Sequence, residues 1–163
     1  MFLTYGPFTI QFPFTVQSKL FYFNETASLP RGLYLKVPIR NLQDGDYVVY
    51  ELTADTKKLA VSRQWIKEDE MFLKKIGAMP NETYCIDPDT LQFFANGKYV
   101  GQVFLEDRKQ LPMPVLRGAY VVGEDEFLPV ADNPRSFDGR YTGTVPIENI
   151  KSKVIPLLTE FHW

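Results

Sequence analysis

Apolar and polar residues alternate over short stretches along most of this chain. Between residues 8 and 16, Phe, Ile and Val occupy every second position, and Thr, Gln and Pro fill the positions between them. This period of two predicts a strand with one wet face. Proline and glycine, with 12 and 10 residues, divide the rest of the chain into similarly short apolar pieces, which is typical of an all-β domain. The strands that we expect are roughly 8–16, 19–23, 33–39, 46–53, 71–79, 91–95, 98–105, 118–123 and 126–131.

The sharpest local signal is a hairpin near the middle of the chain. Asn96-Gly97 separates the apolar runs 91–95 and 98–104, and this dipeptide accepts the positive φ angles that a two-residue hairpin turn needs. One helix is expected over residues 57–68, where four apolar side chains share a face, and a further helical turn over 147–151.

The length of 163 residues fits one domain, 1–163, or one domain with a small inserted lobe. Residues 85–117 contain the hairpin followed by a proline-rich run. We interpret them as a lobe inserted into a catalytic β core made of residues 1–84 and 118–163. The alternative is one continuous sheet with a long loop. The predicted fold class is mainly β, with a small inserted β-hairpin lobe and one or two short helices.

Composition narrows the classes of function. Hydrophobic residues make up 45% of the chain and aromatic residues 15%, enough for a packed core. The net charge of −2 and the scattered basic residues argue against a nucleic-acid partner. One cysteine, Cys85, and one histidine, His162, argue against a disulfide and a zinc site. We therefore expect no metal and no cofactor, and a hydrolase built on this chain has to find its general base elsewhere than in a terminal histidine.

Two adjacent lysines in the predicted strand 71–79 are candidates for chemistry. Alternation places Lys74 on one face with Phe72 and Ile76, and Lys75 on the other face. One of the two lysines must therefore lie beside apolar neighbours. Burial disfavours the ammonium form and lowers the lysine pKa, and a neutral amine can activate a nearby serine. The alternative is an edge-strand lysine whose charged end reaches water.

Two polar segments are less specific when taken alone. Ser28 precedes Leu-Pro in a loop-like stretch, and the Asn-Glu-Thr runs at residues 24–26 and 81–83 match glycosylation sequons of the kind that arise often by chance. Asp138 and Arg140 would point the same way on an extended segment and could brace a site through a charge-assisted pair. The alternative is a turn with a surface ion pair.

The order of these segments resembles the conjugative-transfer signal peptidases of the TraF type, within the wider type I signal peptidase family. The run from Ser28 to Tyr34, Ser-Leu-Pro-Arg-Gly-Leu-Tyr, resembles the family's Ser-Met-Pro-Arg-Gly-Leu-Tyr box. The other matching segments are Gly45-Asp46-Tyr47-Val48-Val49, Leu73-Lys74-Lys75-Ile76, Ser136-Phe137-Asp138-Gly139-Arg140-Tyr141, and Gly143-Thr144-Val145-Pro146 with Val154-Ile155-Pro156-Leu157. The resemblance spans about residues 24–158 and implies a signal-peptidase-like catalytic β-fold.

The resemblance also implies a serine endopeptidase with a Ser–Lys dyad. Ser28 would attack the scissile carbonyl, and a neutral Lys74 would take its proton. The backbone N–H of Ser28 and the hydroxyl of Thr26 would form the oxyanion hole. The residues that would orient and brace the lysine are Ser136, Asp138 and Arg140. Leu29 in place of Met, Gly139 in place of Ser, and Pro80-Asn81 in place of a Pro-Gly-Asp turn depart from the family pattern.

The substrate implied by the resemblance is an exported precursor protein, a conjugative pilin precursor, with a small residue such as Ala before the cleaved bond. Head-to-tail cyclisation of the pilin would follow if an amine resolves the acyl-enzyme. The implied location is the periplasmic face of the cytoplasmic membrane, with the membrane surface as a partner. Family members usually carry a transmembrane helix before the first box, and we expect no such anchor in this chain, because prolines and glutamines interrupt its apolar N-terminal stretch.

Two other classes of function were weighed. A self-cleaving Ser–Lys repressor needs an Ala-Gly or Cys-Gly cleavage site before the serine, and residues 1–27 contain neither. A non-catalytic β-rich module that binds a pilus or membrane partner would have no use for Ser28, Lys74 and Ser136 together. The sequence therefore favours the peptidase.

Overall fold

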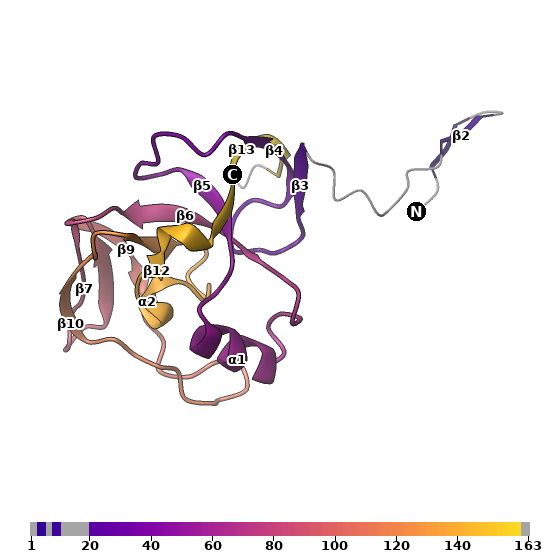
Figure 1. The fold of residues 1–163 in the computed structure, drawn as a ribbon. Helices are drawn as coiled ribbons and strands as arrows, with labels where there is room; N and C mark the ends of the chain where they lie inside the picture. Colours follow the sequence, from indigo (N-terminus) through magenta and orange to yellow (C-terminus); the bar gives the residue numbers. More distant parts are fainter. Residues whose placement is uncertain (1–2, 6–7, 11–19, 161–163) are drawn as a thin grey trace.

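The computed structural model describes residues 3–5, 8–10 and 20–160 of the chain (Figure 1). Strands β1 (Leu3–Tyr5) and β2 (Phe8–Ile10) pair with each other near the N-terminus. The strand predicted over residues 8–16 is confirmed for β2, and its remainder lies outside the described residues, as does His162.

A seven-stranded antiparallel sheet carries most of the chain. Its strand order is β12-β11-β6-β5-β13-β4-β3. The bounds are Phe21–Asn24 for β3, Gly32–Val37 for β4, Tyr47–Tyr50 for β5, Phe72–Ala78 for β6, Glu126–Val130 for β11, Val145–Pro146 for β12 and Ile150–Thr159 for β13. Because β6 lies between β5 and β11, a side chain near its middle is flanked on its face of the sheet by side chains of both neighbouring strands.

A second, four-stranded antiparallel sheet has the order β10-β7-β8-β9. Its strands are β7 (Thr83–Ile86), β8 (Gln92–Ala95), β9 (Lys98–Gln102) and β10 (Gly118–Val121). The predicted hairpin is confirmed, with φ angles of 49° at Asn96 and 73° at Gly97. Strand β7 was missing from the sequence prediction. This sheet begins before residue 85 and ends after residue 117, and the division into a core and an inserted lobe stays a prediction.

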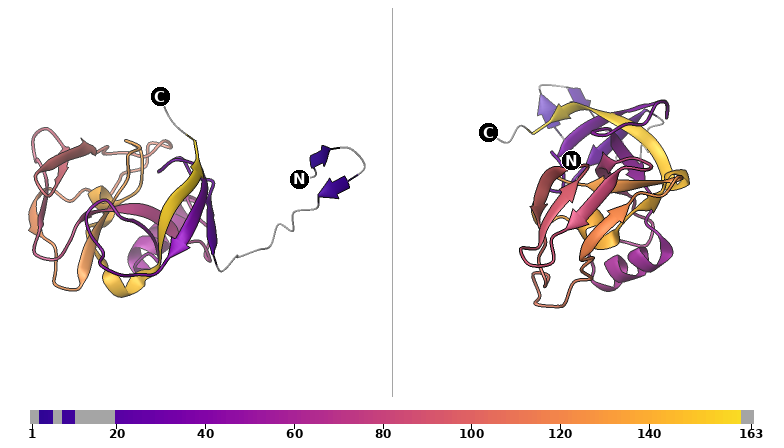
Figure 2. Two further views of the ribbon diagram at one scale, coloured as in Figure 1. Left: turned by 90° about the horizontal axis from the view of Figure 1, so that it is seen from above. Right: turned by 90° about the vertical axis from the view of Figure 1, so that its left-hand side faces the viewer.

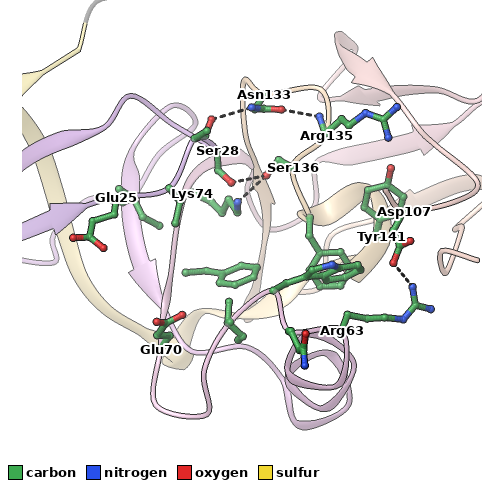
Figure 3. A pocket seen from close by; sticks show the side chains of 18 of the residues that line it. Glu25, Ser28, Arg63, Glu70, Lys74, Asp107, Asn133, Arg135, Ser136 and Tyr141 are labelled. Carbon is green, nitrogen blue, oxygen red and sulfur yellow. Dashed lines mark hydrogen bonds and ion pairs between the residues drawn. The ribbon is translucent and has the colours of Figure 1, made fainter. Parts of the chain in front are cut away.

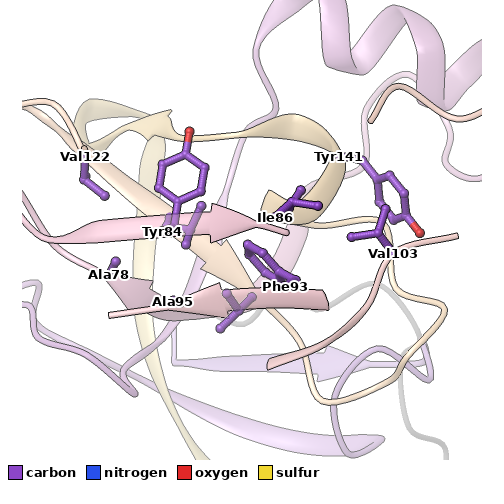
Figure 4. Packing of buried hydrophobic residues seen from close by; sticks show 10 residues of the cluster. Ala78, Tyr84, Ile86, Phe93, Ala95, Val103, Val122 and Tyr141 are labelled. Carbon is purple, nitrogen blue, oxygen red and sulfur yellow. The ribbon is translucent and has the colours of Figure 1, made fainter. Parts of the chain in front are cut away.

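The two sheets share a hydrophobic core. Ala78 of β6 and Leu128 of β11, both fully buried, pack in one cluster with Ile86 and Phe93 of the four-stranded sheet. Figure 4 shows several members of this cluster side by side. In Figures 1 and 2 the four-stranded sheet and the β3–β4–β13 end lie on opposite sides of the molecule, with β6 between them.

The helices are short and differ from the prediction in their bounds. Helix α1 (Ala54–Ser62) begins three residues earlier than expected and ends well before residue 68. The chain leaves the helix where Gln64 adopts a φ of 60°, a left-handed conformation that stops a right-handed helix. Helix α2 (Gly139–Thr142) was not expected.

The turn predicted over residues 147–151 is a 3₁₀ turn, η1 (Ile147–Asn149), and the ten-residue strand β13 follows it at once. In residues 20–160 and the two short N-terminal strands, no helix is long and apolar enough to cross a membrane.

Candidate active site

Ser28 lies in the loop that joins β3 to β4, and this loop is organised around one buried side chain. Asn24, 2% exposed, ends β3. Its Nδ2 donates to the carbonyl oxygens of Thr26 (3.1 Å), Leu29 (3.2 Å) and Pro30 (3.1 Å). Its Oδ1 accepts from the backbone N–H and the hydroxyl of Thr26, at 3.1 and 2.8 Å. The loop therefore wraps around a single carboxamide and presents Ser28, half-buried, at its surface.

The far end of the same loop is fixed by β4. The hydroxyl of Tyr34, a fully buried residue, donates to the Pro30 carbonyl oxygen at 2.6 Å. Gly32 adopts a φ of 137°, and a Cβ at this position would collide with the backbone of Leu158 on β13. The sequence Pro-Arg-Gly-Leu-Tyr thus closes the loop against the sheet because a glycine permits the close approach.

Lys74 lies in the middle of β6 and is 3% exposed. Its Nζ is 5.0 Å from the centre of the Phe72 ring. Burial lowers the pKa of Lys74 to about 8; the negative charge of Asp138 opposes this shift and the positive charge of Arg140 adds to it. The neighbouring Lys75 points to the other face and pairs with Asp132 at 2.6 Å. The expectation that one of the two lysines lies among apolar neighbours is confirmed, and that lysine is Lys74.

A chain of hydrogen bonds connects the two candidate residues (Figure 3). The Nζ of Lys74 donates to the Oγ of Ser136 at 2.7 Å, and the Oγ of Ser136 donates to the Oγ of Ser28 at 3.1 Å. In the part of the chain that the structure describes, no direct hydrogen bond joins Ser28 to Lys74. Ser136 contacts the lysine amine, as the resemblance implied, and it also lies between the amine and the Ser28 hydroxyl.

Asp138 and Arg140 form a buried ion pair behind Ser136. Both side chains are fully buried, with Arg140 Nε 2.8 Å from Asp138 Oδ1 and Nη2 3.0 Å from Oδ2. Asp138 also accepts from the N–H of Ala131, and Arg140 donates to the carbonyl oxygens of Gln102 and Pro134. The pair thereby fixes the loop that carries Ser136.

One expectation about this pair is wrong. The segment is not extended, because Asp138 caps helix α2 and accepts from the Arg140 N–H at 3.2 Å. The expected charge-assisted pair is present, and the alternative of a surface ion pair is excluded because both side chains are fully buried. Burial raises the pKa of the Asp138 carboxyl, and the Arg140 guanidinium acts against this shift.

Thr26 lies in the loop of Ser28, but its hydroxyl donates to Asn24. To donate to an oxyanion, this hydroxyl would have to turn away from the carboxamide. Sequence reasoning missed Asn24 itself. Its only signal was the sequon match at residues 24–26, and a polar residue at a strand end gives no sign of burial until the strand pairing is known.

Ser28 and Lys74 lie at one end of a cleft of about 1520 Å³. Its lining includes the side chains of Trp65, Phe72, Phe104, Met113 and Phe137. At the far end, Arg63, which caps α1, pairs with Asp107 at 2.6 Å and so joins the helix to the loop that follows β9. An elongated, largely apolar cleft of this kind can take an extended peptide. In residues 20–160, no group of three or more His, Cys, Asp or Glu side chains is placed to hold a metal ion.

Comparison with known proteins gives one family. The family model described as signal peptidase, peptidase S26, matches residues 7–158. A search of curated proteins gives no match. The family match covers nearly the whole chain, including both sheets and every candidate residue of the cleft. Because the match spans most of the chain and the fold is mainly β, the chain belongs to the signal peptidase family, peptidase S26.

Proposed function

We propose that this chain is a Ser–Lys endopeptidase of the conjugative-transfer branch, with Ser28 as nucleophile and Lys74 as general base. Membership of the signal peptidase family supports a serine peptidase that processes precursor proteins. The observation that carries the dyad is the hydrogen-bond chain from Lys74 through Ser136 to Ser28, with the lysine buried and its pKa lowered to about 8. A lysine in this state supplies a neutral amine near physiological pH.

The proposed first step transfers one proton along this chain. For this transfer both hydroxyls first turn, so that Ser28 donates to Ser136 and Ser136 donates to the lone pair of the neutral Lys74 amine, the reverse of the directions in the structure. As the Oγ of Ser28 then attacks the scissile carbonyl carbon, its proton moves to the Oγ of Ser136, whose own proton moves to the Nζ of Lys74. The ammonium so formed returns a proton to the leaving amine when the C–N bond breaks, and an acyl-enzyme on Ser28 remains. Water or an amine then resolves the ester. Ser136 orients the lysine and relays the proton, while Asp138 and Arg140 hold its loop in place.

The oxyanion of the tetrahedral intermediate would be stabilised by the backbone N–H of Ser28 and the hydroxyl of Thr26. Thr26 lies two residues before Ser28 in the same loop. Its hydroxyl first has to exchange its bond to Asn24 for one to the oxyanion. Loss of one donor of this kind commonly removes ~2.7–4 kcal/mol of transition-state stabilisation.

We propose a conjugative pilin precursor as substrate, with a small residue before the cleaved bond, because the boxes beginning at Ser28, Leu73 and Ser136 resemble those of the conjugative branch. Cyclisation of the pilin requires only that the pilin's own amine, instead of water, attacks the acyl-enzyme.

We place the reaction at the periplasmic face of the cytoplasmic membrane, and an apolar strip beside the nucleophile loop supports this location. Phe23, Ile155, Leu157 and Leu158 are 63%, 44%, 50% and 71% exposed. The strand register sets Phe23 and Leu158 beside Leu33, and Ile155 beside Leu35, two residues further along β4. Phe23, Ile155 and Leu158 therefore share one face of the sheet, and Leu157 lies at the irregularity between Pro156 and Leu158. An apolar strip of this kind suits the surface of a bilayer.

Incubation of the purified chain with a conjugative pilin precursor tests the proposal. Mass spectrometry should show cleavage, and the product mass distinguishes a linear pilin from a cyclic one that lacks one water molecule. We expect Ser28→Ala and Lys74→Ala to abolish cleavage and Lys75→Ala, on the opposite face of the same strand, to retain it. Cleavage that survives in Lys74→Ala would rule out the proposed base.

The pH dependence is a second test of the same base. Because the neutral amine is the active form, kcat should rise as pH passes through about 8 and then level off. A rate that stays constant between about pH 6 and about pH 10 would contradict a lysine base.

A further inference from the structure

Asn133 makes most of the hydrogen bonds between the nucleophile loop, residues 25–31, and the loop of Ser136, residues 131–138. The Nδ2 of Asn133 donates to the carbonyl oxygen of Ala27 at 3.1 Å. The backbone N–H of Asn133 donates to the carbonyl oxygen of Ser28 at 3.4 Å. Its Oδ1 accepts from the N–H of Arg135 at 2.8 Å. Figure 3 shows Asn133 between Ser28 and Arg135, at the mouth of the cleft.

The orientation of this carboxamide is determined by its two partners. The Ala27 carbonyl can only accept a hydrogen bond and the Arg135 N–H can only donate one. The amino group of Asn133 must therefore face Ala27, and its oxygen must face Arg135. The Asn133 side chain thus donates to the loop of Ser28 and accepts from its own loop, that of Ser136.

The two loops differ in how they are anchored. The loop of Ser136 is fixed to the protein by the Asp138–Arg140 pair. The carboxamide of Asn24 fixes the shape of the nucleophile loop but bonds only to residues of that loop. Between residues 25–31 and 131–138, which the structure describes in full, three hydrogen bonds cross, and Asn133 makes two of them; the third is the Ser136–Ser28 bond itself.

We propose that Asn133 is a positioning residue that holds the Ser28 hydroxyl against Ser136. This inference rests on the proposed Ser–Lys function. We call the two hydrogen bonds from Asn133 to Ala27 and Ser28 the clamp. With the clamp in place, the Ser28 hydroxyl stays within hydrogen-bonding distance of Ser136. Without it, Tyr34 still holds the far end of the loop at Pro30. The segment of Ala27 and Ser28 loses its bond to the Ser136 loop and moves away from Ser136. A displacement of about 1 Å at a reacting group can lower the rate by roughly 100-fold.

Asn133→Asp is the sharpest test, because it keeps the size of the side chain and the acceptor for Arg135. It replaces the donor to Ala27 with an oxygen that repels the carbonyl. Asn133→Leu removes both side-chain polar atoms without adding a charge and leaves only the backbone bond to Ser28. It therefore separates loss of the side-chain bond to Ala27 from any electrostatic effect on Lys74. The matched control is Asn149→Asp, since the Nδ2 of Asn149 donates to the Glu51 carbonyl oxygen at 2.9 Å and Asn149 does not line the cleft.

With the pilin precursor as substrate, we expect kcat to fall by roughly 10- to 100-fold in both Asn133 variants, with KM little changed, because the clamp acts on the reacting hydroxyl and not on substrate binding. The pH profile of Asn133→Leu should keep its midpoint, since the burial of Lys74 is untouched. Asn149→Asp should match the wild-type chain in both constants. A wild-type kcat in both Asn133 variants, or a change in KM alone, would refute the clamp.

Amide hydrogen exchange gives a readout that does not depend on activity. Peptides that cover residues 25–31 should exchange faster in Asn133→Leu, while those that cover β6 should not change. Equal exchange in the nucleophile loop of the variant and the wild type would refute the clamp even if the chain proves to have another substrate. Failure of the wild-type chain to cleave the precursor would instead count against the proposed function.

Discussion

The two halves of the candidate site are held in place by different kinds of side chain. On the side of the base, Lys74, Asp138 and Arg140 are charged or ionisable, almost fully buried, and held on a central strand and at the start of a helix. On the side of the nucleophile, Ser28 lies half-buried on a loop that neutral amide groups hold in place.

The difference fits the role that we propose for each half. A lysine becomes a base near neutral pH only when water is excluded from it, so it needs a buried position and paired charges behind it. A nucleophile has to meet a peptide from solvent, so it belongs on an accessible loop. Carboxamides hold such a loop without bringing a charge that would disturb the pKa of the lysine. Four predictions test this contrast.

The largest effect on stability is expected from Asp138→Ala, which leaves the Arg140 guanidinium buried without its partner. Loss of one member of a buried pair lowers the free energy of unfolding by ~3–5 kcal/mol. Asp132→Ala breaks the surface pair with Lys75 and should lower it by only ~0–1 kcal/mol. Urea unfolding of both variants measures the two losses, and equal losses would show that burial does not distinguish these pairs.

The next effect is a pH dependence of stability that Lys74 introduces. Its pKa is about 8 in the folded chain and 10.5 for an unperturbed lysine. Between these values the unfolded chain binds more protons, so the free energy of unfolding should rise with pH by about 3 kcal/mol relative to Lys74→Met. Urea unfolding of both proteins at about pH 7 and at about pH 11, roughly one unit below and half a unit above this window, measures the difference. A constant difference would mean that the lysine titrates alike in the folded and unfolded chains.

On the nucleophile side, Asn24→Ala should lower the free energy of unfolding by about 2 kcal/mol, because it leaves the Leu29 carbonyl without this partner in a buried loop. The rate of precursor cleavage should fall much more than this loss of stability explains, since the loop presents Ser28. Denaturant unfolding and cleavage assays on the same preparation separate the two effects. Unchanged cleavage would show that Asn24 is not needed to shape the loop.

The smallest effect is expected from Tyr34→Phe. The variant loses the 2.6 Å bond to the Pro30 carbonyl, but that carbonyl still accepts from Asn24. A net loss of about 1 kcal/mol in the free energy of unfolding is expected, with cleavage close to that of the wild type. A loss as large as that from Asn24→Ala would show that the two ends of the loop contribute equally.

Much of the local structure could be read from the sequence because neighbouring residues decide it. Asn96-Gly97 predicted its hairpin, and the short pieces between prolines and glycines predicted most strands of the large sheet. The apolar pattern did not predict strand β13 and placed its first residues in a helical turn, because Lys151, Ser152 and Pro156 break that pattern; only the family resemblance indicated a closing strand, at residues 154–157. The register with β4 and β5 makes it a strand.

For the site, the sequence determined that one lysine of the pair at 74 and 75 would lie among apolar side chains, and the family resemblance supplied the residues to consider. Only the tertiary structure decided that Lys74 is the buried one, that Asp138 and Arg140 lie beneath the surface, and that Ser136 reaches Ser28 across 108 positions of the chain. The physical reason is that burial and long-range hydrogen bonds depend on which strands pair and which faces pack. Local propensity contains no information about strand pairing or about packing between faces. The hydrogen bonds of Asn24 and Asn133 could therefore be identified only in the folded structure.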